Sequence, residues 1–270
     1  MCMKVILSRK GFDSENGGCP SPILEDGTLL SMPIPQSDDK MQYSDIQFNG
    51  ISYAKFWKQL SPINYQSNTH HCHLDPDIRT GIRKNTINDW KPAFGQGGAA
   101  QSHLENQGVA IGDIFLFFGW FRQVECIAGK FHYAKNAEDL HVIYGYMQID
   151  KILKHQDIKK YYWHPHANFT GDCGDLNALY IPSRHLVING TDTGLRGFGT
   201  LNYDKKRVLT VPGMLRTRWK VPFWFKQINI SYHSEKSFKD GYFQSAARGQ
   251  EFVISENPHL AKWVCNLIKD

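Results

Sequence analysis

A short loop at residues 70–77 combines side chains that transfer protons or bind cations. His73, Asp75 and Asp77 alternate with Leu74 and Pro76. In an extended backbone alternate side chains point to the same side, so the imidazole and both carboxylates would converge. Such a group divides acid and base roles or binds a divalent cation. Aspartates flanking a proline are also typical of a plain turn, and that alternative stays open. We predict catalytic roles for His73, Asp75 and Asp77 and assign no metal ligands; the sequence does not determine whether a metal binds.

The segment that follows the first apolar residues has the composition of a phosphate-binding loop. Residues 8–18 contain hydroxyls, several glycines, Arg9 and Lys10. Glycine lets backbone N–H groups approach an anion closely, and the two cations neutralise its charge. No Walker or dinucleotide-binding motif is present, and a glycine-rich turn with a surface cation pair is the alternative. We predict that Arg9 and Lys10 bind a substrate phosphate and that Asp13 belongs to the catalytic group.

Two glutamines and an arginine surround the longest apolar stretch of the chain. Gln96 and Gln101 lie in a glycine-rich segment before it, and Arg122 follows Phe121 at its far end. Glutamine amides read base edges or sugar hydroxyls, and arginine binds phosphate. We predict that all three residues contact the substrate; for Arg122 the alternative is an ordinary surface cation.

The histidines of His164-Pro165-His166 follow three aromatic residues at positions 161–163. Two histidines with one residue between them carry protons near neutral pH or share a metal. The preceding aromatic rings offer flat faces for a nucleic-acid base. A pair that only anchors its loop is the alternative. We predict that His164 and His166 bind substrate.

An amide and a carboxylate open the last apolar strand segment. Gln250 and Glu251 precede Phe252. Glu251 is a candidate general base, and Gln250 a candidate substrate ligand. A glutamate at a strand edge is also commonly structural or simply solvated.

The charge of the chain is concentrated in one segment. The chain has 31 basic and 26 acidic residues, yet residues 201–240 contain nine Lys or Arg against three acids. No carboxylate occurs from residue 205 to 234, where aromatic residues interrupt the cations. This pattern is typical of phosphate contact combined with base stacking; the alternative is a solvated basic hairpin whose aromatic rings face the core. The residues predicted to bind nucleic acid are Lys205, Lys206, Arg207, Arg216, Arg218 and Lys220.

The elements that must position these residues follow from apolar patterning. We expect strands at residues 5–7, 114–121, 141–149, 178–181, 207–211, 228–232 and 252–254, because apolar and branched residues dominate there. Asp26-Gly27 predicts a hairpin turn. Ser52 and Asn257 are expected to cap two helices, and the second has apolar residues at helical spacing from Leu260 to Ile268.

These elements sum to an α+β protein with a mostly antiparallel or mixed sheet, or a partial barrel, and long functional loops. We expect one domain over residues 1–270. The hydrophobic fraction of 41% is sufficient for a core, and the mean hydropathy of −0.44 favours a soluble chain. No apolar stretch reaches the ~20 residues of a membrane-spanning helix. Six cysteines without a CxxC pair favour free thiols, so we expect a cytoplasmic protein.

Taken together, these segments resemble the nucleotide modification associated domain 3 family of phages and bacteria. The resemblance rests on residues 8–14 with 20–22, 26–28, 73–77, 94–96 with 101–104, 112–122, and 164–166. The resemblance implies a role in modifying nucleotides or nucleic-acid bases and leaves the reaction and any cofactor undefined. A second, shorter resemblance is to PUA-like and EVE-like base readers. It rests on Gly112-Asp113 before one strand and on the strand ending at Ile149.

Two functions follow from these residues. The first is an enzyme that modifies a nucleotide or a base in nucleic acid; the alternative is a non-catalytic reader that binds a modified base or RNA. The expected partner in both cases is a nucleotide or nucleic acid and not a membrane. Convergence of the carboxylates in one site would favour the enzyme. The cofactor, the base, the choice of DNA or RNA, and the oligomeric state are not determined by the sequence.

Overall fold

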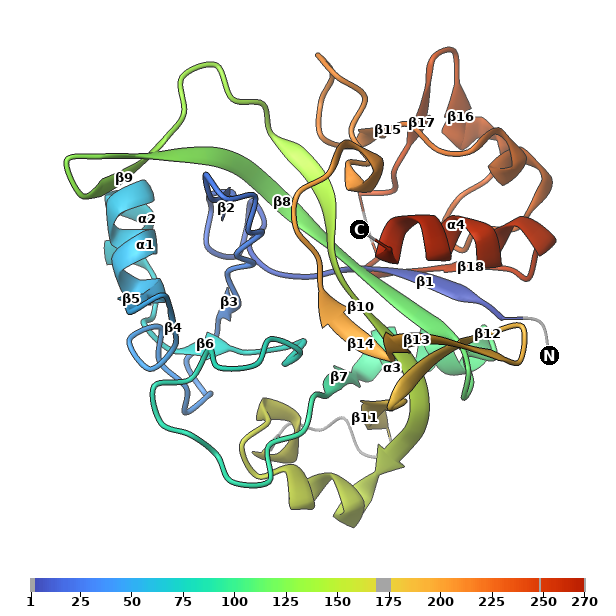
Figure 1. Cartoon of the computed structure of the whole chain (residues 1–270), viewed down its shortest axis with the longest axis horizontal. Helices are drawn as coiled ribbons and strands as arrows, with labels where there is room; N and C mark the ends of the chain where they lie inside the picture. The colour runs from blue at the N-terminus through green and yellow to red at the C-terminus, as the bar shows by residue number, and fades with distance from the viewer. Residues whose placement is uncertain (1–2, 169–175, 248, 270) are drawn as a thin grey trace.

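A mixed sheet curled into a half-barrel runs through the centre of the molecule (Figure 1). The computed structural model describes residues 3–168, 176–247 and 249–269. Along the sheet the strand order is β18-β1-β8-β10-β11-β7. Only the pair β1 and β8 is parallel within this path; the other neighbours are antiparallel. The strands are β1 (Val5–Arg9), β7 (Phe94–Gly97), β8 (Ile114–Ile127), β10 (Leu140–Lys154), β11 (Asn177–Pro182) and β18 (Glu251–Ile254).

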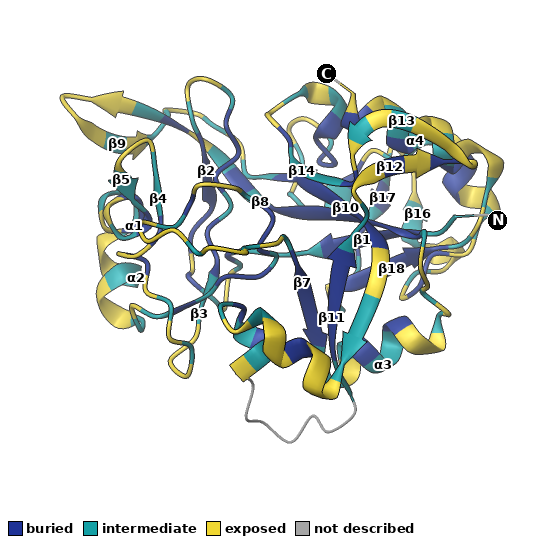
Figure 2. Ribbon diagram, turned by 60° about the horizontal axis from the view of Figure 1, so that its bottom comes forward, coloured by how far each residue is buried: buried dark blue, intermediate teal, exposed yellow. Residues whose placement is uncertain are grey.

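The central strands are buried on both faces, as the apolar runs at residues 5–7 and 114–118 predict. Successive side chains of β1 and β8 alternate between two separate cores. Leu7 and Leu116 pack on one side of the sheet, whereas Ile6 and Phe115 pack on the other. Figure 2 shows these strands enclosed by more exposed elements. The α+β class and the mixed, partly closed sheet predicted from the sequence are confirmed.

Short strands extend the sheet or form small ribbons around it. The strands β2 (Ser21–Ile23) and β9 (Lys130–Tyr133) pair with β8, and β14 (Phe198–Thr200) pairs with β10. The hairpin predicted at Asp26-Gly27 is present, with Gly27 at φ 82°. The remaining strands are β3 (Ile34–Pro35), β4 (Gln47–Phe48), β5 (Ile51–Ser52), β6 (Cys72–His73), β12 (His185–Ile188), β13 (Thr191–Arg196), β15 (Arg218–Trp219), β16 (Phe238–Lys239) and β17 (Tyr242–Gln244).

Helices cover the two ends of the sheet. The helices α1 (Tyr53–Leu60) and α2 (Pro62–Ser67) lie at one end in Figure 1, and α4 (Pro258–Ile268) lies toward the other. Both predicted caps are present: Ser52 Oγ accepts a hydrogen bond from Lys55 N at 3.2 Å, and Asn257 Oδ1 accepts one from His259 N at 2.9 Å. The other helical segments are α3 (Gly98–Asn106) and the 3₁₀ turns η1 (His155–Tyr161), η2 (Pro165–Asn168), η4 (Lys205–Arg207), η5 (Phe223–Gln227) and η6 (Glu235–Ser237). Within the described residues, no helix is long and apolar enough to cross a membrane.

The strands predicted at residues 207–211 and 228–232 are wrong. At the first, residues 205–207 form the turn η4, which Asp204 caps. Residues 228–232 contain one isolated bridge, between Ile230 and Ile254. In the first case Arg207 turns inward and bonds to backbone carbonyls of the C-terminal segment. In the second, Tyr232 has φ 64°, which ends an extended run.

Candidate functional site

The short strand β7 brings two buried polar clusters together. The backbone N–H of Gly95 donates a hydrogen bond to Asp75 Oδ1 at 2.7 Å. The side chain of the next residue, Gln96, donates from Nε2 to Glu251 Oε1 at 2.7 Å. One strand therefore links the loop that contains Asp75 to the edge strand β18, which begins at Glu251. We call the groups around Glu251 the glutamate cluster and those around Asp75 the histidine cluster.

The glutamate cluster is an ion pair with two further donors. Lys10 Nζ lies 3.1 Å from Glu251 Oε1, and Ser8 Oγ donates to the same oxygen at 3.1 Å. The lysine ammonium also lies 4.5 Å from the centre of the Phe94 ring, a cation–π contact. Glu251 is 1% exposed and the Lys10 side chain 9%. Among the described residues, Glu251 Oε2 is buried without a hydrogen-bond partner, so the hydrogen-bonding capacity of this oxygen is unsatisfied inside the fold.

The histidine cluster surrounds a buried carboxylate. His164 Nε2 lies 3.2 Å from Asp75 Oδ1, and His164 Nδ1 accepts the backbone N–H of His166 at 3.3 Å. Burial alone would raise the pKa of Asp75. The contact of His164 with Oδ1, together with the nearby Lys10 ammonium, outweighs this effect, so the pKa of Asp75 lies well below its ordinary value. Asp75 is therefore an ionised carboxylate at neutral pH.

His73 and His166 complete this cluster. Their ring centres are 5.3 Å apart. His73 Nδ1 bonds with Asp39 Oδ2 at 2.7 Å, and His166 Nδ1 with Asn177 Oδ1 at 2.7 Å. Burial lowers the pKa of His166 to about 4, so this imidazole is neutral at pH 7. The ring of His166 lies directly on residue 95, where any Cβ would collide with it, so the site requires glycine there.

A cavity of about 310 Å³ lies beside the histidine cluster. Asp39, the partner of His73, lines it, as do Arg83 and two of the three aromatic residues singled out in the sequence, Tyr162 and Trp163. In the described part of the chain, Trp163 Nε1 is buried without a hydrogen-bond acceptor. The cavity thus combines flat ring surfaces with polar groups able to bind a planar ligand.

Several predicted site residues lie outside both clusters. Asp77 forms a two-point ion pair with Arg83, with a shortest distance of 2.7 Å, and accepts Trp90 Nε1 at 2.8 Å. Asp13 caps its own turn through the backbone N–H groups of residues 15 and 16. Arg9 donates to the carbonyl of Ala246 at 2.7 Å, and burial lowers its pKa. These three residues have structural partners in place.

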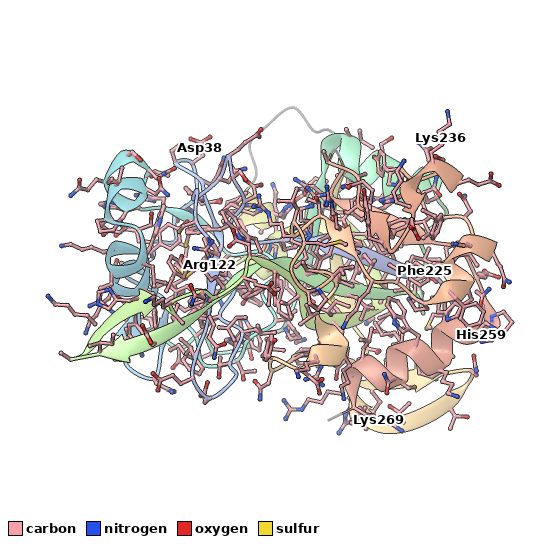
Figure 3. All side chains as sticks on the ribbon, turned by 90° about the horizontal axis from the view of Figure 1, so that it is seen from above. Asp38, Arg122, Phe225, Lys236, His259 and Lys269 are labelled. Carbon is pink, nitrogen blue, oxygen red and sulfur yellow. The ribbon has the colours of Figure 1, made fainter. Side chains whose placement is uncertain are left out.

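The remaining predicted substrate residues are dispersed. Gln101, on α3, accepts a hydrogen bond from the hydroxyl of Tyr180, on β11, at 2.9 Å. Arg122 pairs with Asp139 at 2.8 Å and lies on β8 (Figure 3). Gln250 is exposed and contributes its backbone carbonyl to the N–H of Arg9.

Part of the basic segment lies away from the cavity. In Figure 3, Asp38, which lines the cavity, and Lys236 are on different sides of the molecule. Arg207 is 2% exposed and bonds to the carbonyls of Leu267, Asn202 and Lys269. The other predicted cations remain at least partly accessible: Lys205, Lys206, Arg216, Arg218 and Lys220.

Aromatic rings support two of these accessible cations. The Arg216 guanidinium lies 4.1 Å from the centre of the Trp120 ring, and Arg218 lies 5.0 Å from that of Tyr242. Stacking of this kind holds a guanidinium flat while its edge stays able to bind phosphate.

Sequence reasoning missed Ser8, Asp39 and Asn177. Ser8 is a hydroxyl inside an otherwise apolar strand, which is a usable signal for a buried polar contact. Asp39 has polar neighbours in the sequence, so no local pattern distinguishes it, whereas Asn177 is a single amide at the start of an apolar run. Only the fold brings them to His73 and His166.

The fold and these two clusters define an α+β protein with a buried, ionisable site where the two terminal strands of the curled sheet, β7 and β18, approach each other. A family model described as nucleotide modification associated domain 3 matches residues 4–255, nearly the whole chain, so the chain belongs to that family. The resemblance found in the sequence is thereby confirmed, and the family's description connects the chain with nucleotide modification. Searches of curated proteins and of solved structures found no match.

Proposed function

We propose that this protein is an enzyme that modifies a nucleotide or a base in nucleic acid. The observation that carries the proposal is the convergence on β7 of two carboxylates, Asp75 and Glu251, with Lys10 and the histidine cluster. Buried ionisable groups of both signs are costly to fold and concentrate where chemistry occurs. The family description supplies the substrate class.

The roles follow from the contacts of each group. Glu251 acts as general base through Oε2, because Oε1 already accepts donors from Ser8, Lys10 and Gln96. The Lys10 ammonium stabilises an anion that forms when the base removes a proton from a substrate hydroxyl, ring nitrogen or water. Lys10 keeps a small exposed fraction, so the substrate approaches the glutamate cluster past this side chain.

Only some of the predicted carboxylates converge in one site, which is the arrangement expected for an enzyme. His73, Asp75 and Glu251 belong to neighbouring clusters, whereas Asp13 and Asp77 have separate partners. The catalytic assignment is therefore narrowed to the residues around β7. Asp75 holds the strand in place and contributes negative charge beside the histidines.

A reader that binds a modified base is the second candidate. The cavity lined by Tyr162 and Trp163 favours it, because aromatic walls with a buried N–H donor suit a flat base. In this case the glutamate cluster would be structural and no product would form.

The two functions are separated by mass spectrometry of nucleosides after incubation of the protein with nucleic acid and a metabolite extract. We expect an altered nucleoside with the parent protein, and at least 100-fold less with Glu251→Gln or Asp75→Asn, which keep size but remove charge. Glu235→Gln, at an exposed position, is the matched control. Equal product from the parent and Glu251→Gln would remove Glu251 from catalysis. No product from the parent, together with base binding that requires Trp163, would establish the reader.

A further inference from the structure

We propose that His73, Asp75 and His166 bind one divalent transition-metal ion. Each of the three offers a ligand atom, and these atoms lie within 4.8 Å of one another. Small side-chain rotations bring such atoms to the ~2.1 Å from an ion that zinc and related metals require. The sequence alone could not assign this ligand set, because His166 is 93 positions from His73 and joins it only in the folded chain.

The ligand set is selective for a class of ion. Two imidazoles and one carboxylate on the same side of an ion are the set found with divalent first-row transition metals, and they leave coordination positions open. Magnesium and calcium prefer oxygen ligands throughout, so two histidines disfavour them. The open positions take water or a phosphate or base oxygen of the ligand.

The hydrogen bonds of the two histidines set the correct tautomer for a metal. The Asp39 carboxylate can only accept, so His73 Nδ1 carries the proton and donates at 2.7 Å. The amide of Asn177 is oriented by its own donor bond to the His166 carbonyl, which presents Oδ1 to His166 Nδ1. In both rings the lone pair of the neutral imidazole is therefore on Nε2. An outer carboxylate or amide holding Nδ1 is the usual support of a metal-bound histidine.

The carboxylate is held in a comparable way. Gly95 N donates to Asp75 Oδ1, and His164 Nε2 lies beside the same oxygen. Among the described residues no donor bonds to Asp75 Oδ2, which is the oxygen we assign to the ion. His73 and His166 lie on the side of Asp75 where a shared ion would contact all three ligand atoms.

Access to the ion is available from the cavity side. The His73 side chain is 20% exposed and that of Asp39 15%, and Asp39 also lines the cavity of about 310 Å³. A ligand seated against Tyr162 and Trp163 would therefore lie near the open coordination positions. Metal binding itself depends only on the cluster and not on the proposed nucleotide-modifying activity.

The test is calorimetric titration of the full chain with Co²⁺ and with Zn²⁺, after dialysis against a chelator and without any substrate. We expect one ion per chain, and visible d–d absorption bands when the ion is Co²⁺. His73→Ala and His166→Ala should weaken binding at least 100-fold, and Asp39→Asn, which removes only the outer support, by ~10–100-fold. His132→Ala, at an exposed histidine of β9, is the matched control and should bind as the parent does.

Melting curves of the metal-free variants show whether each one is folded. If an alanine variant is unfolded, the conservative His73→Gln and His166→Gln variants replace it. Absence of binding by the folded parent would overturn the proposal, as would equal affinity in the parent and the folded histidine variants. Because no substrate is present, either result is independent of the nucleotide-modification assay.

Discussion

Single atoms decide whether the site can form. At position 95 even a methyl group would collide with the His166 ring, while the backbone N–H of the same residue holds Asp75. Position 95 therefore requires a residue without a side chain, so that the His166 ring fits, and a backbone N–H that donates to Asp75. At position 251 one carboxylate oxygen accepts three donors and the other none within the described residues. This asymmetry holds the carboxylate in a fixed orientation and leaves one of its oxygens unsatisfied.

The pH dependence of stability can be traced to buried histidines, most directly His141. Burial lowers the pKa of His141 well below its ordinary value of 6.5, and its Nδ1 accepts Trp219 Nε1 at 3.0 Å. The unfolded chain takes up a proton below about pH 6.5, whereas the folded chain does not. The free energy of unfolding should therefore be constant for this group above pH 6.5 and fall by up to ~1.4 kcal/mol per pH unit below it.

Urea unfolding of the parent and of His141→Gln between pH 8 and pH 5 measures this contribution. The variant should be less stable at pH 8 but lose stability less steeply on acidification. His103, His166 and His233 also have lowered pKa values and keep part of the slope in both proteins. Parallel curves for the two proteins would show that His141 does not contribute.

Residue types alone selected many of the side chains that meet in the candidate site. Each of these was selected from the sequence because it is a chemically capable residue beside a strand or in a loop. They are Lys10, His73, Asp75, Gln96, His164, His166 and Glu251. The hydrogen-bond partners of the two histidines were not selected, since no short-range sequence pattern connects Asp39 with His73 or Asn177 with His166. The expected grouping was also incomplete, because Asp77 pairs with Arg83 instead of joining His73 and Asp75.

At the scale of elements, a four-residue strand holds the site together. Through β7 the loop after β6 is hydrogen-bonded to the sheet, and β11 on its other side contributes Asn177. Long apolar strands such as β8 and β10 were predicted from their composition, because burial on both faces requires continuous apolar residues. The strand expected at residues 207–211 failed, because Arg207 finds carbonyl partners in the C-terminal segment that local patterning does not reveal.

The C-terminal helix α4 is expected to stabilise the sheet through its apolar stripe. Leu267 is 2% exposed, and the ring centre of Trp263 lies 5.4 Å from that of Phe225 and 6.1 Å from that of Trp224. Trp263 is half-buried, so Trp263→Ala should cost about 2 kcal/mol, below the value for a fully buried tryptophan. A decrease of roughly 4–8 °C in melting temperature would follow.

Differential scanning calorimetry checks this expectation, with Lys262→Ala, an exposed position on the same helix, as the control. An unchanged melting temperature for Trp263→Ala would mean that the helix does not contribute to the stability of the fold.

At the scale of the whole molecule, the basic segment is only partly separated from the candidate site. Lys236 and the cavity-lining Asp38 lie on different sides in Figure 3, whereas Arg216 donates to Ser14 Oγ at 2.6 Å, in the loop that follows Lys10. If the segment binds nucleic acid, replacing Arg216, Arg218 and Lys220 with Gln should reduce the slope of log affinity against log salt. The expected reduction is ~0.9 per lost phosphate contact on duplex and ~0.7 on single strands.

Fluorescence anisotropy with labelled oligonucleotides at several salt concentrations measures the slope. A charge-matched control replaces Lys55, Lys58 and Lys130 with Gln, which are exposed on α1 and β9 at the opposite end. Identical slopes for the parent and the first variant would remove this segment from the nucleic-acid interface.

The pairing of Ser8 with Glu251 spans 243 positions of the chain. Ser8, Lys10 and Gln96 are synthesised long before the carboxylate to which they bind, and β1 lacks one of its two sheet neighbours until β18 has been made. Contacts between such distant residues form late in folding. Until residue 251 has been synthesised, the Lys10 ammonium therefore has no carboxylate partner, and the edge of β1 that will pair with β18 stays open.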